Sequence, residues 1–183
     1  PYLGQEEITN GIRIKVSPFP KRNELSMLYQ AKATGNYLNS MLALKDALDS
    51  GYDEALIMGT DDSVNEGSGE NFFIVKDGEL LTPDLATVLD GITRKTIITL
   101  AGELKIKTVE KKINLEEAFE CDEAFFTGTA AEVTPIVQIN DKKINNGVPG
   151  EITKRLQKDY FNLVSGNVKK HIEWLTTINN FDD

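Results

Sequence analysis

The sequence predicts a single domain of the α/β class. Its 183 residues lie within the range of one ordinary domain, and 40% hydrophobic and 27% charged residues are typical of a chain that folds around a core. Short stretches with strand-like alternation are interspersed with stretches of helical periodicity. This order favours a sheet flanked by helices, and it indicates the class without the topology.

The N-terminal part predicts a strand and a helix. Segment 11–17 (GIRIKVS) alternates apolar and polar residues and should end as a strand at Ser17-Pro18, before a polar loop over 19–25. We expect a helix over 36–49, ended by Gly51. Its apolar residues recur at helical spacing and are Leu38, Met41, Leu42, Leu44 and Leu48.

The middle of the chain predicts a strand over 54–59 and a hairpin over 71–81 that turns at Asp77-Gly78. We interpret the polar, Gly-rich segment between them as a loop. A helix should open at Gly91-Ile92-Thr93, with Thr93 as a candidate cap. Its apolar face comprises Ile97, Ile98, Leu100, Ala101 and Leu104.

The C-terminal part alternates strands and helices before a weakly patterned tail. The predicted elements are a strand over 107–113, a helix over 115–119, a strand over 123–127, a hairpin over 133–144 that turns at Asn140-Asp141, and a helix over 151–164 that Gly166 ends.

Composition excludes several classes of function. With 20 basic and 29 acidic residues the formal charge is -9, and no run of Lys or Arg offsets it, so nucleic-acid binding is disfavoured. The longest apolar stretches, such as 55–58 and 72–75, are far shorter than the roughly 20 residues of a membrane-spanning helix.

Only one cysteine and one histidine occur in the chain. Cys121 cannot form an internal disulfide, and a cysteine-rich metal site is excluded, so we expect no metal and a cytoplasmic location. His171 has no second histidine for a metal cluster and lies outside any Ser-His-Asp pattern. Because the chain begins at Pro1 without a methionine, we expect it to be a piece of a longer protein.

Three glycine- and threonine-rich segments are candidates for anion binding. They are 66–71 (EGSGEN), 91–94 (GITR) and 127–132 (TGTAAE). The helix start at 91–94 is the best candidate phosphate site, since free N–H groups and the positive end of the helix dipole meet there. The alternative is an ordinary capped helix. A nucleotide site is disfavoured, because Gly67-Ser68-Gly69 lacks the third glycine of the dinucleotide fingerprint and no P-loop is present.

Lys32 is the candidate nucleophile. Its neighbours in the sequence are small and uncharged, and burial of such a lysine would favour the neutral amine that forms a Schiff base. The alternative is a solvated surface lysine.

Four ordered segments carry a family resemblance: 32–38 (KATGNYL), 66–71 (EGSGEN), 91–94 (GITR) and 128–132 (GTAAE). Together they resemble the signature segments of class IV aminotransferases, and the first and last are most similar to the branched-chain amino acid type. The resemblance covers about 31–166. It implies the C-terminal domain of fold-type IV pyridoxal phosphate enzymes, a mixed-sheet pseudo-barrel with flanking helices.

The resemblance also implies a division of the chain and a cofactor. Residues 1–30 would be an interdomain segment with the first strand, 31–167 the catalytic domain that binds pyridoxal 5'-phosphate, and 168–183 a C-terminal tail. An N-terminal domain that supplies a phosphate-binding arginine and the aromatic side-chain pocket would be missing. We therefore expect little or no activity from this chain alone, and a homo-oligomer for the full-length form.

The resemblance assigns roles residue by residue. Lys32 matches the lysine that bonds to the cofactor and moves a proton, and Tyr37 the phenol that hydrogen-bonds its ring oxygen. Glu66 matches the carboxylate that faces the pyridine nitrogen, with a solvated loop carboxylate as the alternative. The remaining matches are Ile92 and Thr93 to the phosphate site, Thr129 to phosphate and substrate carboxylate, and Ala130 to the substrate carboxylate.

Three further residues of these segments have no assigned role. Glu70 and Asn71 would organise their loop or meet the missing domain. Arg94 would be a partner of the phosphate or, as the favoured alternative, an arginine on the helix surface.

The implied function is transfer of an amino group from Leu, Ile or Val to 2-oxoglutarate. A D-amino acid aminotransferase or an aminodeoxychorismate lyase is the close alternative, since both share the lysine and the glutamate. A fragment that serves only as a folded binding domain is the alternative from another class.

Overall fold

The computed structural model describes residues 4–21, 28 and 31–176. Its helices are α1 (Gln5–Asn10), α2 (Tyr37–Asp49), α3 (Ile92–Glu103), α4 (Leu115–Phe119) and α5 (Glu151–Val164), with 3-10 turns η1 (Thr34–Asn36), η2 (Asn145–Gly147) and η3 (Ile172–Trp174). Its strands are β1 (Ile12–Val16), β2 (Glu54–Met58), β3 (Ser63–Glu66), β4 (Asn71–Lys76), β5 (Glu79–Thr82), β6 (Thr108–Glu110), β7 (Ile113–Asn114), β8 (Glu123–Gly128), β9 (Glu132–Ile139) and β10 (Lys142–Lys143).

The strands form one mixed sheet that closes on itself. Its order is β6-β5-β4-β8-β9-β1-β2-β3-β7, and an additional pairing joins β3 to β4, so that β4, β8, β9, β1, β2 and β3 make a ring. Residues Glu66 and Asn71 form this closing pair. β1 runs parallel to both its neighbours, whereas most of the other pairs are antiparallel. The prediction of an α/β fold with a mixed-sheet pseudo-barrel is confirmed.

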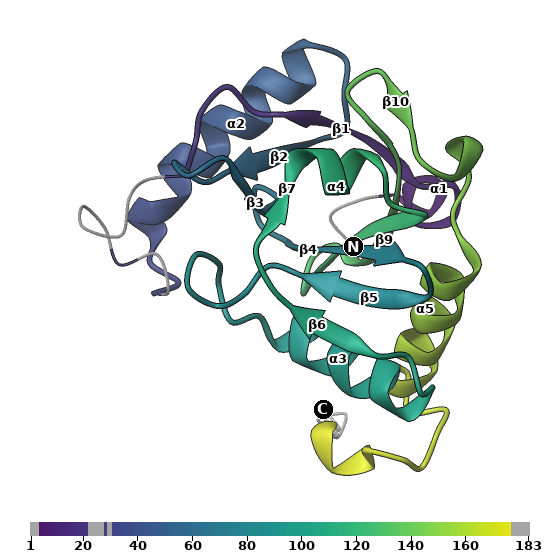
Figure 1. Ribbon diagram of the computed structural model, residues 1–183. Helices are drawn as coiled ribbons and strands as arrows, with labels where there is room; N and C mark the ends of the chain where they lie inside the picture. Colours follow the sequence, from purple (N-terminus) through teal and green to yellow (C-terminus); the bar gives the residue numbers. More distant parts are fainter. Residues whose placement is uncertain (1–3, 22–27, 29–30, 177–183) are drawn as a thin grey trace.

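Apolar side chains pack inside the ring and on its outer faces. The inner cluster includes Ile12, Leu56, Phe72, Phe126 and Ile136. Outside, α3 and α5 cover one face, where Phe73 and Phe125 stack with ring centroids 5.1 Å apart, and α2 packs on β2 at another face (Figure 1). Alternation along β4 and β8 therefore sends neighbouring phenylalanines into two separate cores.

Helix α2 packs through small residues. Ala43 and Ala47 are its buried residues, whereas Leu38, Met41, Leu42 and Leu48 are exposed. The helical spacing of the leucines predicts the helix correctly and still leaves their own face open to solvent. No helix in the described ranges is long and apolar enough to span a membrane.

Most of the predicted elements are confirmed, including both hairpins and the helix over 151–164. The expectation of loop throughout the segment between β2 and β4 is wrong, because 63–66 is strand β3, which pairs with β2, β4 and β7. The single strand expected over 107–113 is two strands, since β6 pairs with β5 and β7 with β3. Helix α1 and the turn η3 in the tail had no sequence signal, and part of the predicted loop over 19–25 lies outside the described residues.

Candidate functional site

A cavity of about 290 Å³ lies where β3 and β4 close the ring, between the start of α2 and the start of α3. Six of the seven predicted site residues line it: Lys32, Tyr37, Glu66, Ile92, Thr93 and Thr129. Ala130 is exposed and follows the lining residue Thr129 directly in the chain. Segments that are up to 97 residues apart in the sequence thus converge on one hollow.

The start of α3 forms one wall of this cavity. Gly91 is the N-cap in an extended conformation, and its carbonyl accepts the first helical hydrogen bond, from Lys95 N. The backbone N–H groups of residues 92–94 therefore have no acceptor within the helix and are available to an anion. Ile92 is 81% exposed at the mouth.

The prediction that Thr93 caps the helix is wrong. Thr93 is buried within the first turn, and no side chain caps Gly91. Its hydroxyl lies beside the phenol of Tyr160 on α5. Burial raises the pKa of Tyr160, and the neighbouring Thr93 hydroxyl partly offsets this. The Thr93 side chain thus contacts Tyr160 and links α3 to α5.

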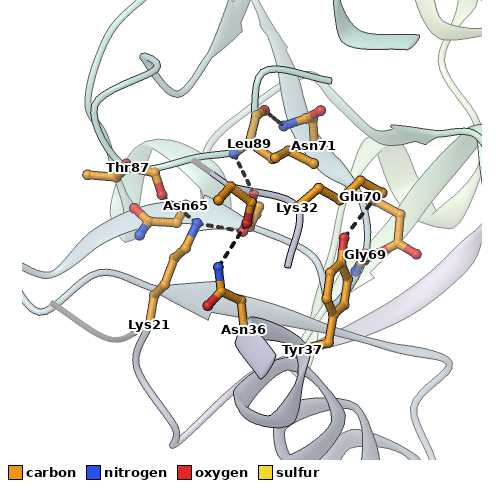
Figure 2. Close-up of polar contacts among 12 residues, drawn as sticks. Lys21, Lys32, Asn36, Tyr37, Asn65, Gly69, Glu70, Asn71, Thr87 and Leu89 are labelled. Atoms are coloured by element: carbon orange, nitrogen blue, oxygen red, sulfur yellow. Dashed lines mark hydrogen bonds and ion pairs between the residues drawn. The ribbon is translucent and has the colours of Figure 1, made fainter. Parts of the chain in front are cut away.

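Glu66 ends β3 as a half-buried ion-pair partner. Its Oε1 lies 2.6 Å from Lys21 Nζ, and its Oε2 accepts a hydrogen bond from Leu89 N at 3.1 Å. Lys21 also donates to Thr87 O at 2.6 Å (Figure 2). The alternative of a loop carboxylate in water is therefore wrong, because protein groups hold both oxygens.

Lys32 and Tyr37 lie together where α2 begins (Figure 2). Lys32 Nζ donates to the Tyr37 hydroxyl at 3.0 Å. The turn between them is held by the Asn36 side chain, which donates to Leu28 O and Ala31 O. Lys32 lines the cavity and is exposed. The burial that would favour its neutral form is therefore not observed in this structure.

Glu70 is buried in the loop 67–70 and lines the cavity. Burial is the main reason that its pKa is raised to about 8, and the charges of Glu54 and Glu66 add to the effect. Gly69 N donates to its Oε2 at 2.9 Å. Glu54 is 2% exposed and accepts a hydrogen bond from Ser68. The buried carboxyl groups of Glu54 and Glu70 therefore both hold the loop through hydrogen bonds. These contacts agree with the expected role of Glu70 in organising its loop.

Asn71 and Arg94 hold the first residues of β4 and the first turn of α3 in place. Asn71 Nδ2 donates to Leu89 O at 2.8 Å, which ties β4 to the segment before α3 (Figure 2). The expectation of a surface arginine is wrong, because Arg94 is 2% exposed. It donates a hydrogen bond to Pro83 O and forms an ion pair with Glu110 at the end of β6. A polar residue early in a helix gives no sequence signal of such long-range burial.

One lining residue was missed at the level of sequence, and another lay in a candidate segment without an assigned role. Lys21 lies in a segment predicted as polar loop. Its place in the site depends on its ion pair with Glu66, which is 45 residues later in the sequence. Thr127 is fully buried, and within the described residues its hydroxyl has no hydrogen-bond partner. No local pattern marks Lys21, whereas Thr127 belongs to the candidate segment 127–132, and its burial depends on the tertiary structure.

Comparisons with known proteins agree with this geometry. The family model described as "Amino-transferase class IV" matches residues 2–139. The branched-chain-amino-acid aminotransferase of Pseudomonas aeruginosa is 49% identical over 97% of this chain and 58% of its own length. The solved Escherichia coli branched-chain amino acid aminotransferase superimposes with a TM-score of 0.94 at 39% identity, over 97% of this chain and 59% of that one.

A further solved structure carries a bound cofactor. The branched-chain amino acid aminotransferase of Thermobaculum terrenum, solved in its PLP-form, gives a TM-score of 0.91 at 37% identity, over 96% of this chain and 58% of that one. The chain therefore spans somewhat more than half the length of the proteins that it matches.

Proposed function

The chain belongs to the class IV aminotransferase family, and from this premise we propose that it is the cofactor domain of a branched-chain amino acid aminotransferase. The proposed reaction moves an amino group from Leu, Ile or Val to 2-oxoglutarate with pyridoxal 5'-phosphate. The observation that carries the proposal is the convergence of Lys32, Tyr37, Glu66 and the start of α3 on one cavity.

The residues present fit this cofactor. A phosphate matches the N–H groups at the start of α3 that have no acceptor within the helix. The buried Thr127 hydroxyl, which has no partner among the described residues, is a further polar group in the same cavity. Lys32 supplies a primary amine for the aldehyde carbon, and Glu66 supplies a carboxylate for the pyridine nitrogen. When bound, the cofactor supplies an electrophilic carbon and an electron-withdrawing ring.

The chain's own residues then divide the work. Lys32 Nζ would hold the cofactor and would serve as the base that takes the proton from the substrate Cα. The Tyr37 hydroxyl, which accepts from Lys32 at 3.0 Å, orients this amine. Glu66 stabilises a proton on the ring nitrogen. No histidine is needed, because one lysine serves as nucleophile and as general base.

Substrate binding is assigned to the turn after β8. We propose that Thr129 and Ala130 present a hydroxyl and backbone N–H groups to the substrate carboxylate, with Thr129 also near the phosphate. The exposed position of both residues, next to the cavity and beside buried Thr127, supports access for a small acid. We propose that a further domain, absent from this chain, determines the choice among Leu, Ile and Val.

The partners are proposals of the same kind. The matched relatives extend well beyond the segment that this chain covers, which supports a further domain that completes the substrate pocket. An apolar face on α2, made by Leu38, Met41, Leu42 and Leu48, supports contact with such a domain or with a second copy.

Reductive trapping tests the cofactor site. Pyridoxal 5'-phosphate is added to the chain, the imine is reduced with borohydride, and the adduct is located by peptide mass. We expect labelling at Lys32 that Lys32→Ala abolishes and the control Lys45→Ala, on exposed α2, leaves intact. Labelling spread over surface lysines would contradict the proposal.

Turnover by the longer protein separates the related activities. Transfer from Leu, Ile and Val to 2-oxoglutarate is the expected result. Turnover of D-alanine or aminodeoxychorismate instead would replace the substrate assignment while leaving the cofactor site in place.

A further inference from the structure

Lys21 and Glu66 form an ion pair inside the cavity. The Nζ to Oε1 distance is 2.6 Å, and the two side chains are only 12% and 17% exposed. They are joined across 45 residues of sequence, from the segment after β1 to the end of β3. A pair this withdrawn from solvent is screened weakly, so the lysine charge acts strongly on the carboxylate.

Both members of the pair are held by backbone groups. Lys21 donates to Thr87 O at 2.6 Å, and Glu66 Oε2 accepts from Leu89 N at 3.1 Å. Thr87 and Leu89 belong to the segment that leads into α3, so the pair is fixed close to the start of α3, where the phosphate site is proposed. Each carboxylate oxygen can accept more than one hydrogen bond, which leaves acceptor capacity for a ring nitrogen.

The surroundings of Glu66 favour neutral carboxyl groups. Glu54 and Glu70 are 2% and 7% exposed, and within the described residues neither forms an ion pair. Burial, aided by the charges of Glu54 and Glu66, raises the pKa of Glu70 to about 8. Of these three carboxyl groups, Glu66 alone has a cation at 2.6 Å. Without a counter-ion, a buried carboxylate would tend to take up a proton.

We propose that Lys21 is a positioning residue that keeps Glu66 ionised and turned toward the pyridine nitrogen of the cofactor. This inference rests on the proposed function. A neutral Glu66 would no longer stabilise a proton on that nitrogen, and the ring would lose electron-withdrawing power. Lys21 therefore acts through Glu66 and does not itself need to touch substrate.

The first test needs no cofactor. Hydrogen exchange at the Leu89 amide, measured by NMR, reports whether Glu66 still accepts its bond. In Lys21→Met we expect exchange to speed up about tenfold, because a hydrogen bond to a charged acceptor exceeds one to a neutral acceptor by roughly 1.4 kcal/mol. Lys21→Gln provides a second charge-free variant if the methionine variant is unfolded by circular dichroism.

Two variants serve as controls. Lys21→Arg keeps the charge and should preserve slow exchange at Leu89. Lys15→Met removes a comparable pair, Lys15 with Asp46 at 2.7 Å on a partly buried surface of β1 and α2, and should leave Leu89 unchanged. A general loss of stability would affect both methionine variants alike, whereas positioning affects only Lys21.

The second test observes the ring nitrogen directly. Pyridoxal 5'-phosphate labelled with ¹⁵N is bound to each variant, and the nitrogen shift reports its protonation. We expect a protonated nitrogen in the wild type, Lys21→Arg and Lys15→Met, and a shift toward the unprotonated form in Lys21→Met.

The outcomes separate the two proposals. Unchanged Leu89 exchange, or an unchanged nitrogen shift in Lys21→Met, would overturn the role of Lys21. A longer protein that includes the further domain and still binds no pyridoxal 5'-phosphate would overturn the proposed function, and the Leu89 measurement would still decide whether Lys21 holds Glu66.

Discussion

Asn71 packs directly against Gly91, the N-cap of α3. Its side-chain oxygen occupies the place that a Cβ at residue 91 would need, while its Nδ2 donates to Leu89 O at 2.8 Å. Asn71 also belongs to the pair that closes the ring with Glu66. The closing point of the sheet and the start of α3, the proposed anion site, are thus in contact through one amide side chain.

Gly91→Ala should therefore impair the proposed phosphate site at the start of α3. The added methyl group displaces Asn71 or the start of α3, and we expect affinity for pyridoxal 5'-phosphate, measured by fluorescence titration, to fall about tenfold. Gly102 is the matched control, since a Cβ there meets nothing within 4 Å. Gly102→Ala should bind normally and gain about 0.5–1 kcal/mol of stability. Equal affinities in the two variants would show that the Asn71 side chain can move away from residue 91 without weakening the binding of pyridoxal 5'-phosphate.

Removal of Arg94 should destabilise the fold. Arg94→Met loses the hydrogen bonds to Pro83 O and Glu110, and we expect the free energy of unfolding in urea to drop by about 2–3 kcal/mol. The neighbouring Lys95 makes a solvent-exposed pair with Asp90. Lys95→Met should change the free energy by less than about 1 kcal/mol, and similar losses in both variants would contradict the structural role of Arg94.

Glu70 should make stability depend on pH. Its pKa is raised from the ordinary 4.5 to about 8 in the folded chain, so the native state favours the neutral form. The stabilising contribution is complete below about pH 4.5 and is lost as the pH rises toward 8. Glu70→Gln, which cannot ionise, should abolish this part of the decline.

Denaturation curves between pH 5 and 8 check the prediction. The wild type should lose on the order of a few kcal/mol relative to Glu70→Gln over this interval. Glu151→Gln, a control on an exposed side chain of α5, should run parallel to the wild type. A wild-type curve that is flat relative to Glu70→Gln would mean that Glu70 is ionised throughout.

Cys121 should be inert in the native state. It is 8% exposed, and burial, with the nearby charge of Asp122, raises its pKa to about 12. Because the thiolate is the reactive form, iodoacetamide at neutral pH should label the folded chain hardly at all and label it fully in urea. Rapid labelling without denaturant would show that the segment after α4 opens locally.

Most of the local elements follow from the sequence alone. Apolar residues at helical spacing predict α2, α3 and α5, and Asp77-Gly78 and Asn140-Asp141 predict the two hairpin turns, because these signals act within a few residues. Six predicted site residues also line one cavity, and their four segments share the order of a family signature. Their individual roles stay predictions that the proposed experiments address.

Tertiary structure decided which side chains are buried and which distant residues meet. Three features depend on contacts between distant segments: the pairing of Lys21 with Glu66, the burial of Arg94, and the exposure of Leu38, Leu42 and Leu48 on α2. Periodicity records the conformation of neighbouring residues, whereas ion pairs and burial depend on segments brought together from across the chain. The sequence by itself therefore determined the elements and the candidate chemistry, and the closed ring determined the electrostatic setting in which that chemistry would operate.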